Sequence, residues 1–356
     1  MTTPPVVDEN RLSEFVGRFA GDLGAVLHAA TVLIGDKLGL YRAMADGEPV
    51  TAEELAGRTG TDGRYASEWL AAQAASGYAE YDPETGRFHL TPEQAFALTS
   101  EYNPFFAPGG LQVAASTIKD ADLVAEAIRE GKGVGWHQHH HDLFDGTERF
   151  FRPNYIGNLV SDWIPALDGV EEKLRAGAKV ADLGCGYGSS TIIMAREYPD
   201  SVFHGFDFHE PSVEVARERA IEAGVADRCF FETASAKGYP GGGYDFVTSF
   251  DSLHDMGDPV GAAKHVLEGL DSDGTWMIVE PFANDRLEDN LTPVGRIFYS
   301  ASTTLCVPAS KDQEVGLALG AQAGEARTRE VVATGGFSRF RRAAETPFNL
   351  IFEARP

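Results

Sequence analysis

A glycine-rich stretch in the middle of the chain is the first candidate for chemistry. Residues 180–190 read VADLGCGYGSS, and their glycines fall at the alternate positions Gly184, Gly186 and Gly188. Small apolar residues precede them and an apolar run of helical character follows, so the pattern predicts a strand, a tight turn and a helix start. Glycine lets a ligand approach the main chain closely. We therefore expect a nucleotide-type site at the carboxyl end of a first strand.

A histidine with acidic neighbours is the second candidate. Residues 250–259 read FDSLHDMGDP and contain His254. A histidine titrates near pH 6.5, at about neutral pH, and can take a proton from a nucleophile. Such a base needs a carboxylate that holds its tautomer and orientation, for which Glu280 is our first candidate and Asp255 our second. The alternatives are that His254 only lines a pocket or only supports the fold.

The elements that must position these residues alternate between strands and helices. From residue 177 onward the sequence predicts an α/β domain with a doubly wound, mostly parallel sheet. The last two strands follow each other without room for a crossover helix, so they should pair antiparallel. The expected strands after the glycine stretch are 201–208, 229–233, 244–250, 274–280, 337–343 and 349–354, and the expected helices are 211–223, 259–270 and 324–334.

The N-terminal part is predicted to be helical, with a winged helix inside it. A long amphipathic segment covers 11–44, and a helix, turn, helix and hairpin follow between residues 51 and 90. Residues 51–100 carry three bases and eight acids. Phosphates would be repelled by this charge, so we expect scaffolding or dimer formation and no DNA binding. The domain boundaries that we predict are 1–100, 101–176 and 177–356.

The linker between the two domains is rich in histidine and aromatic residues. His137 and His141 have the spacing of metal ligands on one helix face. Three consecutive histidines cannot all face one ion, however, so we expect no metal, and the cluster is either solvated or part of a substrate-facing lid. A long segment from 281 to 325 either covers the mouth of the site or packs on a partner subunit. The candidate substrate residues of the linker and this segment are Trp136, His139, His140, Tyr155, Phe298 and Tyr299.

Composition and charge narrow the class of protein. The 356 residues have a formal net charge of -24, which opposes nucleic-acid binding. We see no apolar run near the roughly 20 residues needed to cross a bilayer and no signal peptide, so we expect no membrane association. Three scattered cysteines favour a reducing compartment. These features predict a cytoplasmic enzyme with a small-molecule substrate.

From about Lys179 to the C-terminus the chain resembles the class I S-adenosylmethionine-dependent methyltransferases. The winged helix and linker are similar to those of small-molecule O-methyltransferases that dimerise through such a domain. A dinucleotide enzyme would have G-x-G-x-x-G, but Ser189 stands at the last glycine position. The segment around His254 resembles the H-D-W-S-D-E segment of the plant-type enzymes, with His254, Asp255 and Asp258 matching and Met256 in place of tryptophan.

The resemblance implies a seven-stranded, Rossmann-like sheet, a homodimer, and transfer of a methyl group to an oxygen of a small aromatic or apolar molecule. Asp207 would accept hydrogen bonds from the ribose diol, and Ser235 takes the place of an acid that usually meets the adenine. Asp207 could instead be a solvated strand-end acid and Ser235 a plain turn residue. Methylation of nitrogen or carbon by proximity, and a cofactor-sensing regulator, remain open. The implied cofactor residues are Asp182, Gly184, Gly186, Gly188, Asp207, Phe208, Ser235, Ala236 and Phe250.

Overall fold

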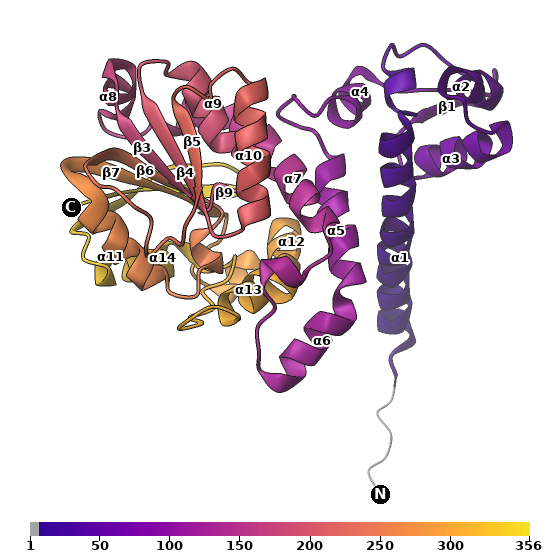
Figure 1. Ribbon diagram of the computed structural model, residues 1–356. Coiled ribbons are helices and arrows are strands. Elements are labelled where there is room, and N and C mark those ends of the chain that lie inside the picture. The colour runs from indigo at the N-terminus through magenta and orange to yellow at the C-terminus, as the bar shows by residue number, and fades with distance from the viewer. Residues whose placement is uncertain (1–6) are drawn as a thin grey trace, which may run out of the picture. The chain divides into compact units, whose positions relative to one another are not determined.

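The computed structural model describes residues 7–356. The chain divides into two compact units, residues 1–115 and 116–356, which are considered separately below (Figure 1).

The first unit consists of one long helix and a winged helix. Helix α1 (Glu9–Leu38) begins after Asp8, whose side chain accepts the backbone N–H groups of Asn10 and Arg11, and ends at Gly39 in a left-handed conformation. A capping box opens helix α2, since the side chains of Thr51 and Glu54 accept each other's backbone N–H groups. The remaining elements of this unit are η1 (Arg42–Met44), α2 (Ala52–Thr59), α3 (Gly63–Ala75), β1 (Glu80–Asp82), β2 (Arg87–His89) and α4 (Pro92–Thr99).

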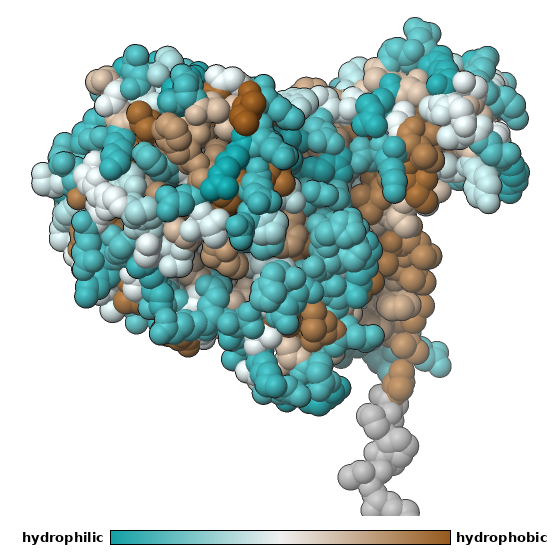
Figure 2. Space-filling model, in the orientation of Figure 1, coloured by the Kyte–Doolittle hydropathy of each residue, from teal (hydrophilic) through white to brown (hydrophobic). Residues whose placement is uncertain are grey.

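Helix α1 leaves a row of large apolar side chains exposed along its length, and Figure 2 shows this surface in brown. By length and composition alone α1 is apolar enough to cross a membrane, which differs from our expectation that no run is long enough. Only 17% of its most apolar window is buried, and a single helix of this kind is weak evidence for a span. The exposed apolar residues of α1 are Leu12, Phe15, Val16, Phe19, Leu23, Val26, Leu27, Ile34 and Leu38.

The second unit begins with helices and then forms the sheet. Helix α5 (Pro108–Lys119) crosses the boundary between the units. The other elements before the sheet are α6 (Ala121–Glu130), η2 (Trp136–Gln138), α7 (Asp142–Asn158), η3 (Leu159–Trp163) and α8 (Val170–Ala176). The sheet and its helices comprise β3 (Lys179–Leu183), α9 (Ser189–Glu197), β4 (Val202–Asp207), α10 (Glu210–Glu222), β5 (Cys229–Thr233), β6 (Tyr244–Phe250), η4 (Leu253–Asp255), α11 (Pro259–Gly269), β7 (Leu270–Pro281), η5 (Leu287–Asn290), α12 (Pro293–Ala301), η6 (Ser302–Cys306), α13 (Val307–Lys311), α14 (Gly324–Thr334), β8 (Arg339–Glu345) and β9 (Asn349–Arg355).

The sheet has seven strands in the order β5-β4-β3-β6-β7-β9-β8. Strand β9 runs antiparallel to both of its neighbours, and the other pairs are parallel. The predicted doubly wound sheet with one antiparallel strand near its edge is therefore confirmed.

Helices cover both faces of the sheet, with α8, α9 and α10 on one side and α11 and α14 on the other (Figure 1). Successive strand residues point to opposite faces, so Val180 packs in one core and Ala181 in the other. Because β3, β4, β5, β6 and β7 are parallel, their carboxyl ends meet at one edge of the sheet.

Candidate active site

The turn between β3 and α9 is the floor of the site. Its glycines all adopt left-handed conformations, with φ of 72° at Gly184, 52° at Gly186 and 78° at Gly188. Added Cβ atoms would come within 2.8 Å of Ser252 at Gly184 and 2.6 Å of Phe231 at Gly188, whereas no atom lies within 4 Å at Gly186. Only glycine fits the first and third positions, and the space above Gly186 stays open for a ligand.

Asp182 anchors this turn from below. Its Oδ2 accepts hydrogen bonds from the hydroxyl groups of Ser190 at 2.7 Å and Thr191 at 2.6 Å, and its Oδ1 accepts one from Thr248 at 2.9 Å. Burial raises the pKa of Asp182, and the three hydroxyl groups act against that shift. The carboxylate does not line the cavity, and its hydrogen bonds are all made with protein hydroxyl groups. Because Ser190 and Thr191 belong to the first turn of α9, Asp182 orients the start of that helix.

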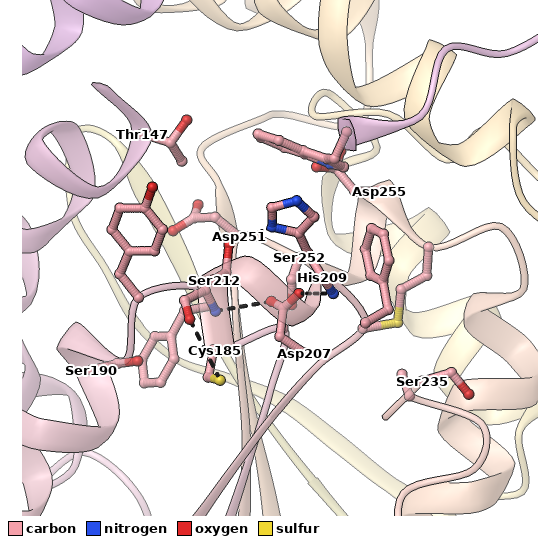
Figure 3. A pocket seen from close by; sticks show the side chains of 18 of the residues that line it. Thr147, Cys185, Ser190, Asp207, His209, Ser212, Ser235, Asp251, Ser252 and Asp255 are labelled. Atoms are coloured by element: carbon pink, nitrogen blue, oxygen red, sulfur yellow. Dashed lines mark hydrogen bonds between the residues drawn. The ribbon is translucent and has the colours of Figure 1, made fainter. Parts of the chain in front are cut away.

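Asp207 ends β4 and faces the glycine turn. Its Oδ2 accepts the backbone N–H of Gly186 at 2.9 Å, and its Oδ1 accepts that of His209 at 2.8 Å (Figure 3). Burial raises the pKa of Asp207, while these backbone N–H groups act to lower it. Each oxygen has two lone pairs, so the carboxylate can still accept hydrogen bonds from a ligand.

A cavity of about 520 Å³ opens beside Asp207. This volume suits a small organic molecule. One end is lined by the glycine turn, and the wall beyond Asp207 by the turn that follows β5. The residues of these two regions and of the segment from Asp207 to the start of α10 are Gly184, Cys185, Gly186, Tyr187, Ser189, Ser190, Asp207, Phe208, His209, Ser212, Ala234, Ser235, Ala236 and Lys237.

Aromatic side chains from the linker form another wall of the cavity. Trp136, Phe144, Phe151 and Tyr155 all come from the segment that precedes the sheet. Tyr155 lies with its ring centroid 5.1 Å from that of Phe250, at the end of β6. The segment therefore places apolar surface directly over the strand ends.

His254 lies in the short turn η4 and is held between two carboxylates. Its Nδ1 is 2.5 Å from Glu280 Oε2, and its Nε2 is 3.2 Å from Asp255 Oδ1. Burial opposes the charged imidazole, but the carboxylates of Glu280 and Asp255 outweigh it and raise the pKa of His254 well above its ordinary value. His254 is thus buried, with one ring nitrogen hydrogen-bonded to Glu280 and the other near the Asp255 carboxylate.

The cavity meets this network through Asp255. Asp255 lines the cavity, whereas His254 and Glu280 do not. Burial raises the pKa of Asp255, and His254 and Cys306 act against that rise. Burial likewise raises the pKa of the Cys306 thiol to about 12, so the thiol is protonated near neutral pH.

Asp251 is a lining residue that our sequence analysis did not propose. It follows β6 with a φ of 48°, in the left-handed region that favours glycine, and a backbone conformation of this kind often marks a functional site. Asn349 Nδ2 donates a hydrogen bond to its Oδ1 at 2.9 Å. Burial and the charge of Glu280 raise the pKa of Asp251 well above its ordinary value. The strand-end position that indicated Asp207 would also have indicated Asp251.

The structure brings about half of the predicted site residues together. Those that line the cavity are Gly184, Gly186, Asp207, Phe208, Ser235, Ala236, Phe250, Asp255, Trp136 and Tyr155. Those that lie outside its lining are Asp182, Gly188, His254, Glu280, His139, His140, Phe298 and Tyr299. His139 is buried with its Nδ1 3.0 Å from Asp120 Oδ2, so it supports the linker. The cavity is also lined by Phe144 and Phe151 of the aromatic linker, which was one candidate for a substrate-facing lid, and by Thr147 and Glu148, which no strand end or motif marks.

Comparisons with known proteins agree with this architecture. Residues 174–318 match the family model described as a methyltransferase domain, and residues 27–100 match the Rv2258c-like winged HTH domain. The chain is similar to 27-O-demethylrifamycin SV methyltransferase of Amycolatopsis mediterranei (strain S699), with 42% identity over 87 residues, 24% of this chain and 32% of the relative. It is also similar to ubiquinone biosynthesis O-methyltransferase of Pectobacterium carotovorum (strain PC1), with 42% identity over 85 residues, 23% of this chain and 34% of the relative. The chain thus spans about a third of the length of these curated relatives.

Solved structures share the fold over nearly the whole chain. A putative O-methyltransferase from Nostoc punctiforme has a TM-score of 0.72 at 18% identity, covering 96% of this chain and 98% of its own. Human N-acetylserotonin methyltransferase in complex with SAM has a TM-score of 0.70 at 15% identity. The match covers 100% of this chain and 99% of the human chain.

The fold and the domain match define a methyltransferase domain at the carboxyl-terminal side of the chain. A winged helix-turn-helix domain precedes it. The predicted resemblance to S-adenosylmethionine-dependent methyltransferases with an N-terminal winged helix is confirmed at the level of these domains.

Proposed function

We propose that this protein is an S-adenosylmethionine-dependent methyltransferase that methylates an oxygen atom of a small aromatic or apolar molecule. One observation carries the proposal: a single cavity joins the glycine turn and Asp207 to an aromatic wall and the carboxyl group of Asp255. The first half suits a nucleoside with an amino-acid tail, and the second half suits an apolar acceptor.

The residues of the first half fit S-adenosylmethionine. The open space above Gly186 admits the methionine portion close to the main chain. Asp207 would accept hydrogen bonds from the ribose diol, and Phe208, Ser235 and Ala236 would flank the adenine. When bound, this cofactor supplies an electrophilic methyl group.

The residues of the second half would bind the acceptor and take its proton. The rings of Trp136, Phe144 and Tyr155 exclude water and hold a flat apolar molecule. Asp255 lines the cavity and lies next to the His254 imidazole, so it would accept the hydrogen bond from the acceptor hydroxyl. His254 and Glu280 would position Asp255 from behind and hold the transferred proton within the buried network.

A panel of small aromatic molecules tests this proposal. Purified protein is incubated with S-adenosylmethionine and matched phenols and anilines, and release of S-adenosylhomocysteine is followed with the mass of the product. We expect methylated phenols, and loss of turnover in Asp255→Asn. Methylation of anilines alone, with full activity in Asp255→Asn, would instead support nitrogen methylation by proximity.

We also infer that the protein forms a homodimer through its N-terminal unit. The apolar face of α1 provides a surface that a second copy of the same helix would cover. A regulatory role on DNA is disfavoured because the arginine of α3, Arg64, pairs with Glu68 at 2.5 Å. Three free, buried cysteines suit a reducing cytoplasm.

A further inference from the structure

The inference concerns Glu148, a buried carboxylate at the glycine-turn end of the cavity. Glu148 lies on α7 and lines the cavity, and its side chain is 6% exposed. No motif marks it in the sequence. Burying a carboxylate in a ligand cavity costs free energy unless charged or hydrogen-bonding partners contact it.

Protein groups surround one oxygen of this carboxylate. Glu148 Oε1 accepts a hydrogen bond from the Ser189 hydroxyl at 2.7 Å, and it lies 2.8 Å from Arg219 NH1 and 3.2 Å from Arg152 NH1. Ser189 is the first residue of α9 and directly follows Gly188. These contacts fix the Glu148 carboxylate beside the glycine turn.

A second contact fastens α7 to the same turn. The hydroxyl of Tyr187 lies 3.3 Å from Asp145 Oδ1, three residues before Glu148. The guanidinium of Arg219 lies 5.0 Å from the centroid of the Tyr187 ring. The position of Glu148 relative to the glycine turn is therefore set by two independent contacts of one helix.

The amino-acid end of the cofactor carries an ammonium group with three N–H donors and no acceptor. Backbone N–H groups at a glycine turn and helix start suit its carboxylate but not this ammonium. Resting on the proposed function, we infer that Glu148 accepts a charge-assisted hydrogen bond from the α-ammonium of S-adenosylmethionine and of the product S-adenosylhomocysteine.

The other acids of the cavity are placed for other tasks. Asp207 holds the turn and faces the ribose region, and Asp251 and Asp255 lie by the acceptor region. Asp258 and Glu314 pair with Lys237 at 3.3 Å and 2.8 Å. Among the lining residues from 136 to 314, Glu148 is the carboxylate that contacts the helix start at the glycine turn.

Calorimetry with two ligands tests the inference without turnover. S-adenosylhomocysteine has the amino-acid end, and 5′-methylthioadenosine has the same adenine, ribose and sulfur without it. We expect Glu148→Gln to lower the affinity for S-adenosylhomocysteine about 10- to 100-fold. The affinity for 5′-methylthioadenosine should stay within about twofold of the wild-type value. The matched control is Asp142→Asn on the same helix, which pairs with Lys119 and does not line the cavity, so it should keep the wild-type ratio of the two affinities.

An analogue of S-adenosylhomocysteine without the α-amino group provides a second measurement on the wild-type protein, independent of whether the variant folds. This analogue should bind wild type about 10- to 100-fold more weakly than the parent ligand, and the difference should shrink in Glu148→Gln. If Glu148→Gln changes the affinities for both ligands of the first test equally, or changes neither, the inference is overturned. Glu148 would then only form ion pairs that support the fold. If wild type binds none of these ligands, the proposed function itself fails.

Discussion

The imidazole of His254 and the carboxylate of Glu280 form a buried pair, with Nδ1 2.5 Å from Oε2. Neither residue of the pair lines the cavity, whereas Asp255, 3.2 Å from His254 Nε2, does. Each ring nitrogen of His254 has a carboxylate beside it, and His254 does not line the cavity, so we propose that Asp255 takes the proton from an acceptor. In this proposal the pair positions Asp255, a role that the spacing of the residues in the sequence did not distinguish from direct base catalysis.

Asp255→Asn should lower kcat about 100-fold or more, because the amide cannot accept a proton from the acceptor. The KM for the acceptor should change little, since the aromatic wall supplies most of the binding. Steady-state rates across a range of pH measure both parameters. If Asp255→Asn keeps its kcat while His254→Gln loses it, the general base would be His254 and not Asp255.

His254→Ala should destabilise the protein by about 3–5 kcal/mol, because it leaves Glu280 buried without its partner. Glu280→Gln should cost less, since the amide oxygen can still accept a hydrogen bond from the imidazole. Denaturant unfolding of the two single variants and of the double variant gives the coupling energy. Additive effects would show that the two side chains do not stabilise each other.

Cofactor affinity should fall as the pH is lowered toward the pKa of Asp207. Burial raises that pKa above its ordinary value of about 3.9, and only the ionised carboxylate accepts both hydroxyl groups of a ribose. Affinity is therefore present above the pKa and lost as the pH falls through it. Calorimetry with S-adenosylhomocysteine from pH 8 to about pH 5 measures the trend. The Asp207→Asn variant should bind weakly at every pH. An equal decline of affinity with falling pH in that variant would show that another group causes the pH dependence.

Two alanine substitutions in the glycine turn should have different effects. Gly188→Ala should destabilise the fold by about 2–4 kcal/mol, because its Cβ would meet Phe231 and its backbone is left-handed. Gly186→Ala should cost about 1–2 kcal/mol from the backbone alone but should block the ligand space. Thermal unfolding and cofactor binding separate the two effects. Equal stability losses with unimpaired binding in Gly186→Ala would contradict the assigned ligand space.

Charge placed on the apolar face of α1 should disrupt the homodimer. Phe19 and Leu23 are 57% and 49% exposed, so Phe19→Glu with Leu23→Glu should give a monomer by light scattering while the fold is retained. Arg18→Glu, on the exposed surface of the same helix, is the control and should stay dimeric. A wild-type monomer that sediments with lipid vesicles would show instead that the face binds membrane.

The sequence predicted those features that follow from periodicity and strand ends. The strands 229–233 and 244–250 and the helix 324–334 agree with the structure residue for residue, and Asp207 lies where a strand-end acid should lie. Side chains in irregular turns were not predictable in this way, because no period fixes their direction. His254 in a 3-10 turn does not line the cavity, and Glu148 reaches it only through the packing of α7 on the glycine turn.

Binding of S-adenosylhomocysteine by isothermal titration calorimetry tests the central claim most directly. The account predicts saturable binding with one site per chain, weakened by Asp207→Asn, and no binding of NAD at the same concentration. Absence of heat with S-adenosylhomocysteine and S-adenosylmethionine, with saturable binding of NAD, would contradict it.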